Sequence, residues 1–316
     1  MQDICSRLQS LVFDAVKRCK AESISLSGGL DSSIIASCLD AKTTQAYVMV
    51  AADFPSTDLV HAQLVAKLSG LKLTIISASI DELLQAIEQT IKILHVFNPI
   101  EIRNNVVLYL TMKNAKNDGF KSIMTGDGAD ELFAGYHFFQ RMQQSELQKD
   151  LERIWKIMHF PSMSISKALG IALQAPFLDE KIVEYAKSIP PELKIHEEND
   201  KKYGKWVLRK TFEGMLPQSI VWRDKDAMQD GSGTNGLTHF FDSLIPDSVF
   251  LEKTKKYLEK EQAALLSKEA LYYYEIYRRY HDYPARLGLS KNKCPHCSYS
   301  VEEGSHFCRM CGAFPI

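Results

Sequence analysis

The apolar positions of the first 125 residues fall into short continuous runs, and between these runs the apolar residues recur every three to four positions. Short apolar runs predict β-strands, and the wider spacing predicts amphipathic helices. The predicted strands are residues 23–27, 46–51, 71–77 and 122–125. The predicted helices are residues 32–39, 59–68, 81–94 and 104–115. Apolar strands that alternate with helices are typical of an α/β fold with a parallel sheet that helices cover on both faces.

The pattern changes twice later in the chain. From about residue 140 it becomes mainly helical, with a glycine-rich, flexible loop expected at residues 231–236. From residue 290 aliphatic side chains become scarce, and Lys, Cys, Gly and Ser predominate. We therefore predict three segments: an α/β domain at 1–240, a helical extension at 241–289 and a small module at 290–316. The later segments with helical spacing are residues 146–158, 180–188, 205–215 and 251–280.

Composition narrows the function classes only a little. The chain has 316 residues, 45% of them hydrophobic, and its 38 basic and 39 acidic residues nearly cancel. Such a balance gives no electrostatic argument for binding nucleic acid or a membrane surface. The first ten residues lack the apolar core of a signal peptide, and no run approaches the roughly 20 apolar residues of a membrane span. We expect a soluble, cytoplasmic protein.

The strongest chemical signal is the sequence SGGLDSS at residues 27–33, between the first predicted strand and the first predicted helix. Two glycines let the backbone approach a ligand closely, and the free N–H groups at a helix start attract anions. No Gly-Lys-Ser/Thr follows, so the loop is not a Walker A loop. A plain helix cap is the alternative interpretation. The residues expected to contact ATP in this loop are Ser27, Gly28, Gly29, Asp31, Ser32 and Ser33.

A second acidic loop, TGDGADELFAGY at residues 125–136, follows the fourth predicted strand. Open α/β sheets bind their ligands at the carboxyl ends of strands. Two acidic loops at neighbouring strand ends can share Mg²⁺ over a triphosphate and leave one carboxylate free to act as a base. The alternative is an acidic turn with structural glycines.

Together these motifs resemble a known family. SGGxDS is similar to the phosphate loop of the PP-loop ATP pyrophosphatases, and GDGADELFAGY resembles the GxGxDExFxGY loop of the synthetase domain of asparagine synthetases. Further similar motifs follow in the same order, and the resemblance covers about residues 20–240. These motifs are PFLD at 176–179, KWVLR at 205–209, LP at 216–217, WRDK at 222–225 and DGSG at 230–233.

The resemblance implies a role for each matching residue. Asp31 and Asp130 would bind Mg²⁺, and Asp127 would act as the base toward an incoming amine. Lys205 and Lys225 would stabilise the charge that develops on departing pyrophosphate, which is how a cation can favour the transition state. The residues implied to lie along ATP are Thr125 and Gly126, and those implied to hold its adenosine are Leu26 and Val50, with Ala51 beside it.

Two departures from the family pattern bear on the substrate. Nothing resembling the glutaminase domain precedes the phosphate loop, so we expect nitrogen from free ammonia, a separate glutaminase or an amine on the substrate. The family often reads ExRxPFLD, whereas Ala172 and Gln174 stand at the two charged positions. A small charged acid such as aspartate needs paired charges in a dry site, so their loss weakens the case for aspartate.

The seven cysteines form two groups. Cys5, Cys19 and Cys38 are scattered, and we assign them no role. The other four form two CxxC pairs separated by ten residues, the spacing of a structural zinc ribbon, with a disulfide pair as the alternative. The expected zinc ligands are Cys294, Cys297, Cys308 and Cys311. The ribbon could contact RNA, a protein or its own chain, and the Tyr- and Arg-rich residues 272–280 could stack on RNA or, as we favour, pack as a helix.

We therefore expect an amide-forming ligase that uses ATP, Mg²⁺ and a small carboxylic acid, releases AMP and pyrophosphate, and carries Zn²⁺. Three alternatives remain. The first is an intramolecular amide-forming enzyme of the β-lactam synthetase kind, and the second is a tRNA-modifying PP-loop enzyme. The third is an ATP-binding regulator that has lost catalysis.

Overall fold

The computed structural model describes residues 1–198, 201–287, 291–303 and 305–316, and these form two compact units. The first unit comprises Met1–Met49, Thr57–Ile76 and Thr111–Ala227. The second comprises Val50–Ser56, Ser77–Leu110 and Met228–Ile316. The segment boundaries expected at residues 240 and 290 stay a prediction.

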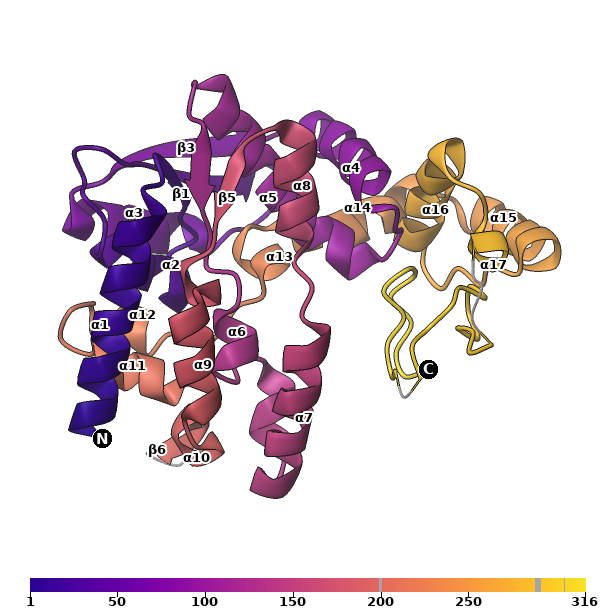
Figure 1. The fold of residues 1–316 in the computed structure, drawn as a ribbon. Helices are drawn as coiled ribbons and strands as arrows, with labels where there is room; N and C mark the ends of the chain where they lie inside the picture. Colours follow the sequence, from indigo (N-terminus) through magenta and orange to yellow (C-terminus); the bar gives the residue numbers. More distant parts are fainter. Residues whose placement is uncertain (199–200, 288–290, 304) are drawn as a thin grey trace. The chain divides into compact units, whose positions relative to one another are not determined.

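The secondary structure elements follow one another along the chain as labelled in Figure 1. The first elements are α1 (Gln2–Cys19), β1 (Ser23–Ser25), α2 (Leu30–Ser37), β2 (Gln45–Ala51), α3 (Asp58–Ser69), β3 (Lys72–Ala78), α4 (Ile80–Leu94), α5 (Pro99–Asn117), β4 (Ser122–Met124), α6 (Ala129–Leu132), the 3-10 helix η1 (His137–Arg141), α7 (Gln144–Ile157), α8 (Pro161–Leu169) and β5 (Ala172–Gln174). The later elements are η2 (Pro176–Leu178), α9 (Glu180–Ser188), α10 (Pro191–Lys194), β6 (His196–Glu198), β7 (Lys201–Tyr203), α11 (Trp206–Phe212), α12 (Gln218–Val221), α13 (Met228–Gly231), η3 (Thr234–Gly236), α14 (Leu237–Leu244), α15 (Asp247–Glu261), α16 (Lys268–Tyr280) and α17 (Pro284–Leu287).

A five-stranded sheet with the strand order β3-β2-β1-β4-β5 organises the fold. β1 pairs in parallel with both β2 and β4, and β4 pairs in parallel with β5. The chain leaves β1 toward β2 on one side and later returns as β4 on the other side, so β1 and β4 form the topological switch point of the sheet. Open α/β sheets bind ligands at the carboxyl ends of such strands.

The predicted parallel α/β fold is confirmed, and the burial of the strands explains why their pattern was readable. Ile24 of β1 and Ile123 and Met124 of β4 are fully buried, as expected of central parallel strands that are covered on both faces. The pattern missed α1, whose apolar side chains at Leu8 and Val12 are buried and which packs on α9 and α11. It also missed β5, which is only three residues long.

The second unit is mainly helical. α16 packs against α4, α14 and α15, so the helical segment predicted at residues 251–280 is in fact two helices, α15 and α16. The glycine-rich segment predicted as a flexible loop is built of α13 and η3, and its Ser232 and Thr234 are fully buried. A buried ion pair, with Arg103 Nη1 2.5 Å from Glu269 Oε2, joins α5 to α16.

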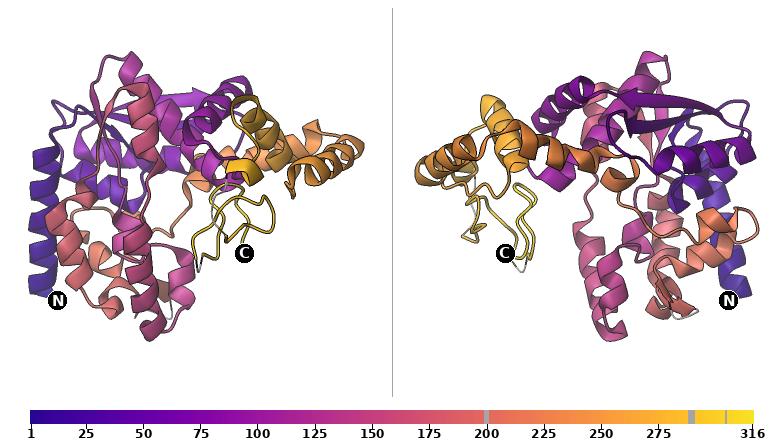
Figure 2. Two further views of the ribbon diagram at one scale, coloured as in Figure 1. Left: turned by 45° about the vertical axis from the view of Figure 1, so that its right-hand side comes forward. Right: turned by 180° about the vertical axis from the view of Figure 1, so that it is seen from behind.

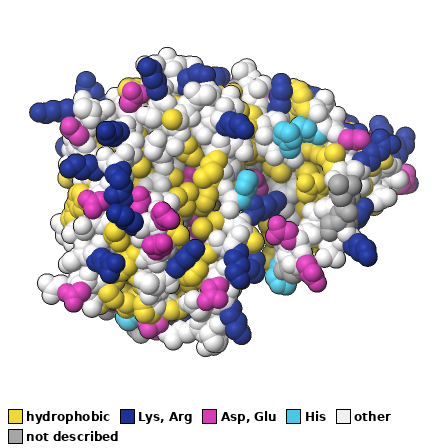
Figure 3. All heavy atoms as spheres, in the orientation of Figure 1, with side chains coloured by type: hydrophobic (Ala, Val, Ile, Leu, Met, Phe, Trp, Pro, Cys, Tyr) yellow, Lys and Arg dark blue, Asp and Glu magenta, His cyan; other side chains and the backbone are white. Residues whose placement is uncertain are grey.

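The visible surface carries no block of one charge. In Figure 3, basic and acidic side chains are interspersed over the face shown, in agreement with the nearly balanced composition. Among the described residues, no helix combines the length and the apolar character that crossing a membrane would require.

Candidate functional site

Two loops meet at the switch point of the sheet. One follows β1 and leads into α2, and the other follows β4 and leads into α6. The loops approach so closely that a Cβ added at Gly126 would lie 2.9 Å from Cβ of Asp31. Gly28 has φ +72°, and a Cβ there would lie 2.4 Å from the backbone of His61, so a side chain is excluded for two reasons. The predicted meeting of the two glycine-bearing loops is confirmed.

Hydroxyl groups line the first loop. Ser27 Oγ accepts a hydrogen bond from Gly29 N at 3.2 Å and lies 3.2 Å from Ser32 Oγ, while Ser32 Oγ also lies 3.2 Å from Gly29 O. Ser33 Oγ is buried and has no hydrogen-bond partner among the described residues. An orphaned hydroxyl at the start of a helix suits an anionic ligand such as phosphate.

Four charged side chains form what we call the acid–lysine cluster: Asp31, Asp130, Lys205 and Lys225. Lys205 Nζ lies 2.5 Å from Asp31 Oδ2 and 2.7 Å from Asp130 Oδ1, so one ammonium joins the two loops. Lys225 Nζ lies 2.5 Å from the other oxygen of Asp130. The structure thus brings together both predicted magnesium ligands and both predicted pyrophosphate lysines.

The cluster is held in its charged form. Burial disfavours the charged carboxylate of Asp130, but Lys205 and Lys225 outweigh burial and keep the pKa of Asp130 below its usual value. Burial likewise opposes the charge on Lys205, yet Asp130 and Asp31 raise the pKa of this lysine. Two carboxylates and two ammoniums therefore balance one another at the strand ends.

The carboxylates also suit a metal ion. Asp31 Oδ1 is buried and has no hydrogen-bond partner among the described residues, although the other oxygen of Asp31 binds Lys205. Carboxylate oxygens are the protein ligands that Mg²⁺ prefers, usually in combination with substrate phosphates. The donor set of Asp31 and Asp130 fits that ion.

Both lysines are held in place by their backbone surroundings. Lys205 adopts the left-handed conformation with φ 55°, unusual for a residue other than glycine, and its N–H donates to Phe133 O at 3.0 Å. Lys225 lies in the irregular segment after α12, where the ammonium is 5.1 Å from the ring centre of Tyr136. Arg209 connects the two lysine segments, since its Nε donates to Gly204 O at 2.9 Å and its Nη1 to Arg223 O at 3.0 Å.

Asp127 is held by two hydroxyl groups. Ser162 Oγ donates to Asp127 Oδ2 at 2.5 Å, and Thr125 Oγ1 donates to the same oxygen at 2.9 Å. Burial raises the pKa of Asp127, and both hydrogen bonds oppose the increase. A carboxyl group with a raised pKa beside charged neighbours is a candidate proton acceptor.

The remaining ATP residues are less constrained by the structure. Leu26 is fully buried, and its N–H donates to Tyr47 O at 2.7 Å across the β1–β2 pair. Val50 lies near the end of β2 and belongs to the second unit. The adenosine contacts of these two residues stay a prediction.

Several residues that position the site carried no sequence signal. Ser162 lies in α8, outside every recognised motif. Tyr136 Oη donates to Glu131 Oε1 at 2.5 Å, inside the second loop. Arg223 anchors the Lys225 segment, because its Nη2 lies 2.6 Å from Asp226 and 3.3 Å from the buried Asp58. The WRDK pattern contained Arg223, but no spacing pointed to Asp58.

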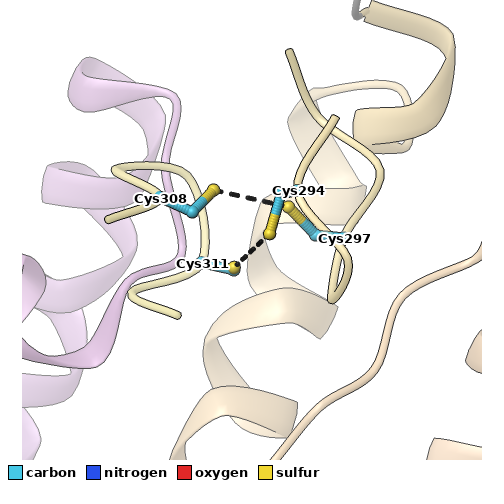
Figure 4. Close-up of side chains that lie close together, drawn as sticks. All are labelled: Cys294, Cys297, Cys308 and Cys311. Atoms are coloured by element: carbon cyan, nitrogen blue, oxygen red, sulfur yellow. Dashed lines mark hydrogen bonds between the residues drawn. The ribbon is translucent and has the colours of Figure 1, made fainter. Parts of the chain in front are cut away.

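The four predicted cysteine ligands also converge, within the second unit. All four sulfur atoms lie within 4.8 Å of one another (Figure 4). The Sγ atoms of Cys294 and Cys311 are 3.7 Å apart, as are those of Cys297 and Cys308. This distance is too long for a disulfide bond. It matches the roughly 3.8 Å edge of a tetrahedron of thiolates at about 2.3 Å from zinc.

Comparison with known proteins identifies similar chains. The asparagine synthase family model matches residues 7–159 and 143–286. The asparagine synthetase [glutamine-hydrolyzing] of Rattus norvegicus is 31% identical over 281 residues, which are 83% of this chain and 49% of that protein. Asparagine synthetase [glutamine-hydrolyzing] 2 of Oryza sativa subsp. japonica is 29% identical over 279 residues, 81% of this chain and 46% of that protein.

These figures also set a limit. The chain spans about half the length of the curated relatives that it matches. A solved structure of NMN synthetase from Francisella tularensis aligns with 89% of this chain and 94% of that chain, at a TM-score of 0.39 and 14% sequence identity. That structural similarity is too low to carry a conclusion.

Proposed function

The chain belongs to the asparagine synthase family, and we propose that it is an ATP-dependent carbon–nitrogen ligase that releases AMP and pyrophosphate. One observation carries the proposal: Lys205 Nζ contacts both Asp31 and Asp130, so acids from two separate loops and a lysine share one point at the strand ends. Such a group can hold a magnesium nucleotide and stabilise its leaving group.

The proposed reaction has two steps. The carboxylate of a small acid attacks the α-phosphorus of ATP, the bond to the β-phosphate oxygen breaks, and an acyl-adenylate and pyrophosphate form. Ammonia or an amine then attacks the acyl carbon, and AMP leaves as the amide forms. Bound Mg²⁺ would supply charge neutralisation over the phosphates at Asp31 and Asp130.

The protein groups have distinct proposed roles. The hydroxyls of Ser27, Ser32 and Ser33 and the start of α2 bind phosphate oxygens. Lys205 and Lys225 move from their carboxylate partners toward the pyrophosphate as its charge grows. Asp127 accepts the proton that the attacking amine loses, with Ser162 and Thr125 holding its second oxygen in place.

The acyl substrate is the open part of the proposal. Ala172 and Gln174, at the family's two charged positions, lie in β5, and Gln174 O accepts a hydrogen bond from Thr125 N at 2.9 Å. The uncharged pair thus lies beside the second loop. This favours an acid other than aspartate, including one that carries its own amine as in an intramolecular amide synthetase.

The structure gives less support to an RNA substrate. Tyr273, Tyr274 and Tyr277 of the Tyr- and Arg-rich segment are fully buried in α16, so they are packed in the protein core and cannot stack on bases. A cytoplasmic location, the Zn²⁺ ion and ammonia delivered freely or by a separate glutaminase complete the proposal.

The test is a product assay. The protein is incubated with Mg²⁺, ATP, ammonia and a panel of carboxylic acids that includes aspartate and β-amino acids, and AMP, pyrophosphate and amide are measured. We expect equal amounts of AMP and pyrophosphate with at least one acid, and dependence on that acid. Release of ADP and phosphate would contradict the proposed chemistry. Absence of nucleotide turnover with every acid would favour an ATP-binding regulator.

A further inference from the structure

The four-cysteine module is bound to the helices of its own unit through two equivalent atoms. In each CxxC pair, the backbone carbonyl of the residue just before the second cysteine accepts a hydrogen bond from the parent chain. His296 O accepts from Ala264 N at 2.6 Å, and Met310 O accepts from Phe97 N at 3.0 Å. Figures 1 and 2 show these loops, in yellow, beside the helices α15 and α16.

We propose that the module is an internal metal-dependent clamp: bound zinc fixes both CxxC turns so that they hold the start of α5 and the α15–α16 connection, and through α5 they order Met228–Gly236. This inference does not depend on the proposed reaction. It assigns the module a partner, namely its own unit, instead of RNA or another protein.

The contact with α5 is close. Asn98 Oδ1 accepts from Ile100 N at 3.1 Å and so caps α5 at its N-terminus. Gly312, directly after the last cysteine, has φ +82°, and a Cβ there would lie 2.5 Å from that same oxygen of Asn98. Asn98 itself is almost fully buried. The second CxxC turn therefore covers the capping residue.

The aromatic side chains beneath the module complete the interface. Phe97, whose amide binds the second CxxC turn, packs against Tyr274 and Tyr277 with ring centres 4.8 and 5.4 Å apart. Both tyrosines lie in α16, which follows the connection that contains Ala264. One packed group of rings therefore lies under both anchor points.

From its start, α5 reaches the Met228–Gly236 segment within two turns. Asn104 Oδ1 accepts from Gln229 N at 2.9 Å, and Arg103 O accepts from Thr234 Oγ1 at 3.2 Å. The segment in turn binds the end of β2, because Ser232 O accepts from Ala51 N at 2.9 Å. Each link is a direct hydrogen bond within the second unit.

Zinc is needed for this arrangement on chemical grounds. The four sulfur atoms are gathered within 4.8 Å, and four thiolates at such distances repel one another unless a cation binds them. Without the metal the turns lose the geometry that presents the two carbonyls. Whatever binds only the ordered state stabilises it, so zinc stabilises every element that the turns hold.

Amide hydrogen exchange on the full chain tests the clamp. Zinc content is measured first, and exchange is then compared between zinc-loaded protein and protein stripped with a chelator. We expect about one zinc per chain, and at least about tenfold faster exchange in peptides covering residues 97–105 and 228–236 after stripping. Peptides covering β1 and β4 should not change. A change confined to residues 291–316, or protein that binds no zinc, would overturn the proposal.

A pair of glycine variants separates docking from metal binding. Gly312→Ala keeps all four cysteines but places a methyl group against Asn98. Gly214→Ala is the matched control, since Gly214 has a similar φ of +91° and no atom within 4 Å of its added Cβ. We expect Gly312→Ala to exchange faster at residues 97–105 while zinc stays bound, and Gly214→Ala to behave as wild type there. Unchanged exchange at residues 97–105 in Gly312→Ala would overturn the proposal. If Gly312→Ala loses zinc, the chelator comparison alone decides.

Discussion

The acid–lysine cluster and the four-cysteine cluster each bring together four side chains, but they are assembled in opposite ways. The cysteines lie between residues 294 and 311, so two local turns suffice to gather them. The acid–lysine residues lie between 31 and 225 and meet only because β1 and β4 are neighbours in the sheet. The first cluster already balances its own charges, whereas the second requires a cation. This difference predicts different responses to substitution and to pH.

The largest effect should come from Lys205→Met. It removes the ammonium that joins the two loops and the charge proposed to stabilise pyrophosphate, so pyrophosphate release should fall by about 1,000-fold. Lys202→Met is the control, since Lys202 is exposed and only three residues away. The assay is pyrophosphate release at saturating ATP. Equal rates in both variants would show that the cluster is a structural ion pair only.

Cys311→Ser tests the second cluster. Loss of one of four thiolates should weaken zinc binding by more than about 100-fold, beyond the roughly 10–100-fold effect typical of residues outside the ligand set. Cys38→Ser is the control, because burial raises the pKa of the Cys38 thiol to about 11 and that residue is outside the cluster. Competition with a chromogenic chelator measures both. Unweakened zinc binding by Cys311→Ser would contradict the four-thiolate site.

Acid should separate the two clusters. The pKa of Asp130 is lowered in the folded protein, so its ion pairs stabilise the fold above the usual carboxyl pKa, and this contribution is lost as pH falls through the lower folded value. Asp130→Asn should cost on the order of 2 kcal/mol of unfolding free energy at pH 7 and almost nothing at the most acidic pH. Zinc should leave earlier, near pH 5, as the thiolates gain protons. Urea unfolding and zinc release, both without magnesium, measure the two. A pH-independent cost of Asp130→Asn would contradict the charged cluster.

The smallest effect should come from Ser162→Ala. Removing a hydrogen bond to the Asp127 carboxylate raises the pKa of Asp127 further, so the acidic limb of the kcat/KM profile should move up by about one pH unit. Rates at high pH should change only slightly. Ser166→Ala is the control, because Ser166 lies on the same helix and its hydroxyl binds Met163 O instead. An unshifted profile would mean that Asp127 is not the proton acceptor.

Sequence analysis located the two clusters for different reasons. The cysteine spacing alone specified the second, because short-range geometry constrains residues so few positions apart. The first needed motif order together with the rule that ligands bind where parallel strands end. Lys205 and Lys225 could be found only by family resemblance, since no local pattern distinguishes them from surface lysines.

The residues that the sequence did not reveal act through tertiary contacts. Ser162 reaches Asp127 across 35 positions and lies in no motif. β5 was missed because three residues cannot display a period. The segment 231–236 was expected to be a flexible loop because glycines favour turns, but Ser232 and Thr234 are buried there and hydrogen-bonded to other elements.

The central claim is that Asp31 and Asp130 act as one magnesium nucleotide site. Isothermal titration calorimetry of ATP, with Mg²⁺ and with EDTA, tests it most directly on the wild type, Asp31→Asn and Asp130→Asn. The account predicts that Mg²⁺ tightens ATP binding at least about tenfold in the wild type and that each variant loses this dependence. If both variants keep the full magnesium dependence, the two loops do not form the proposed site.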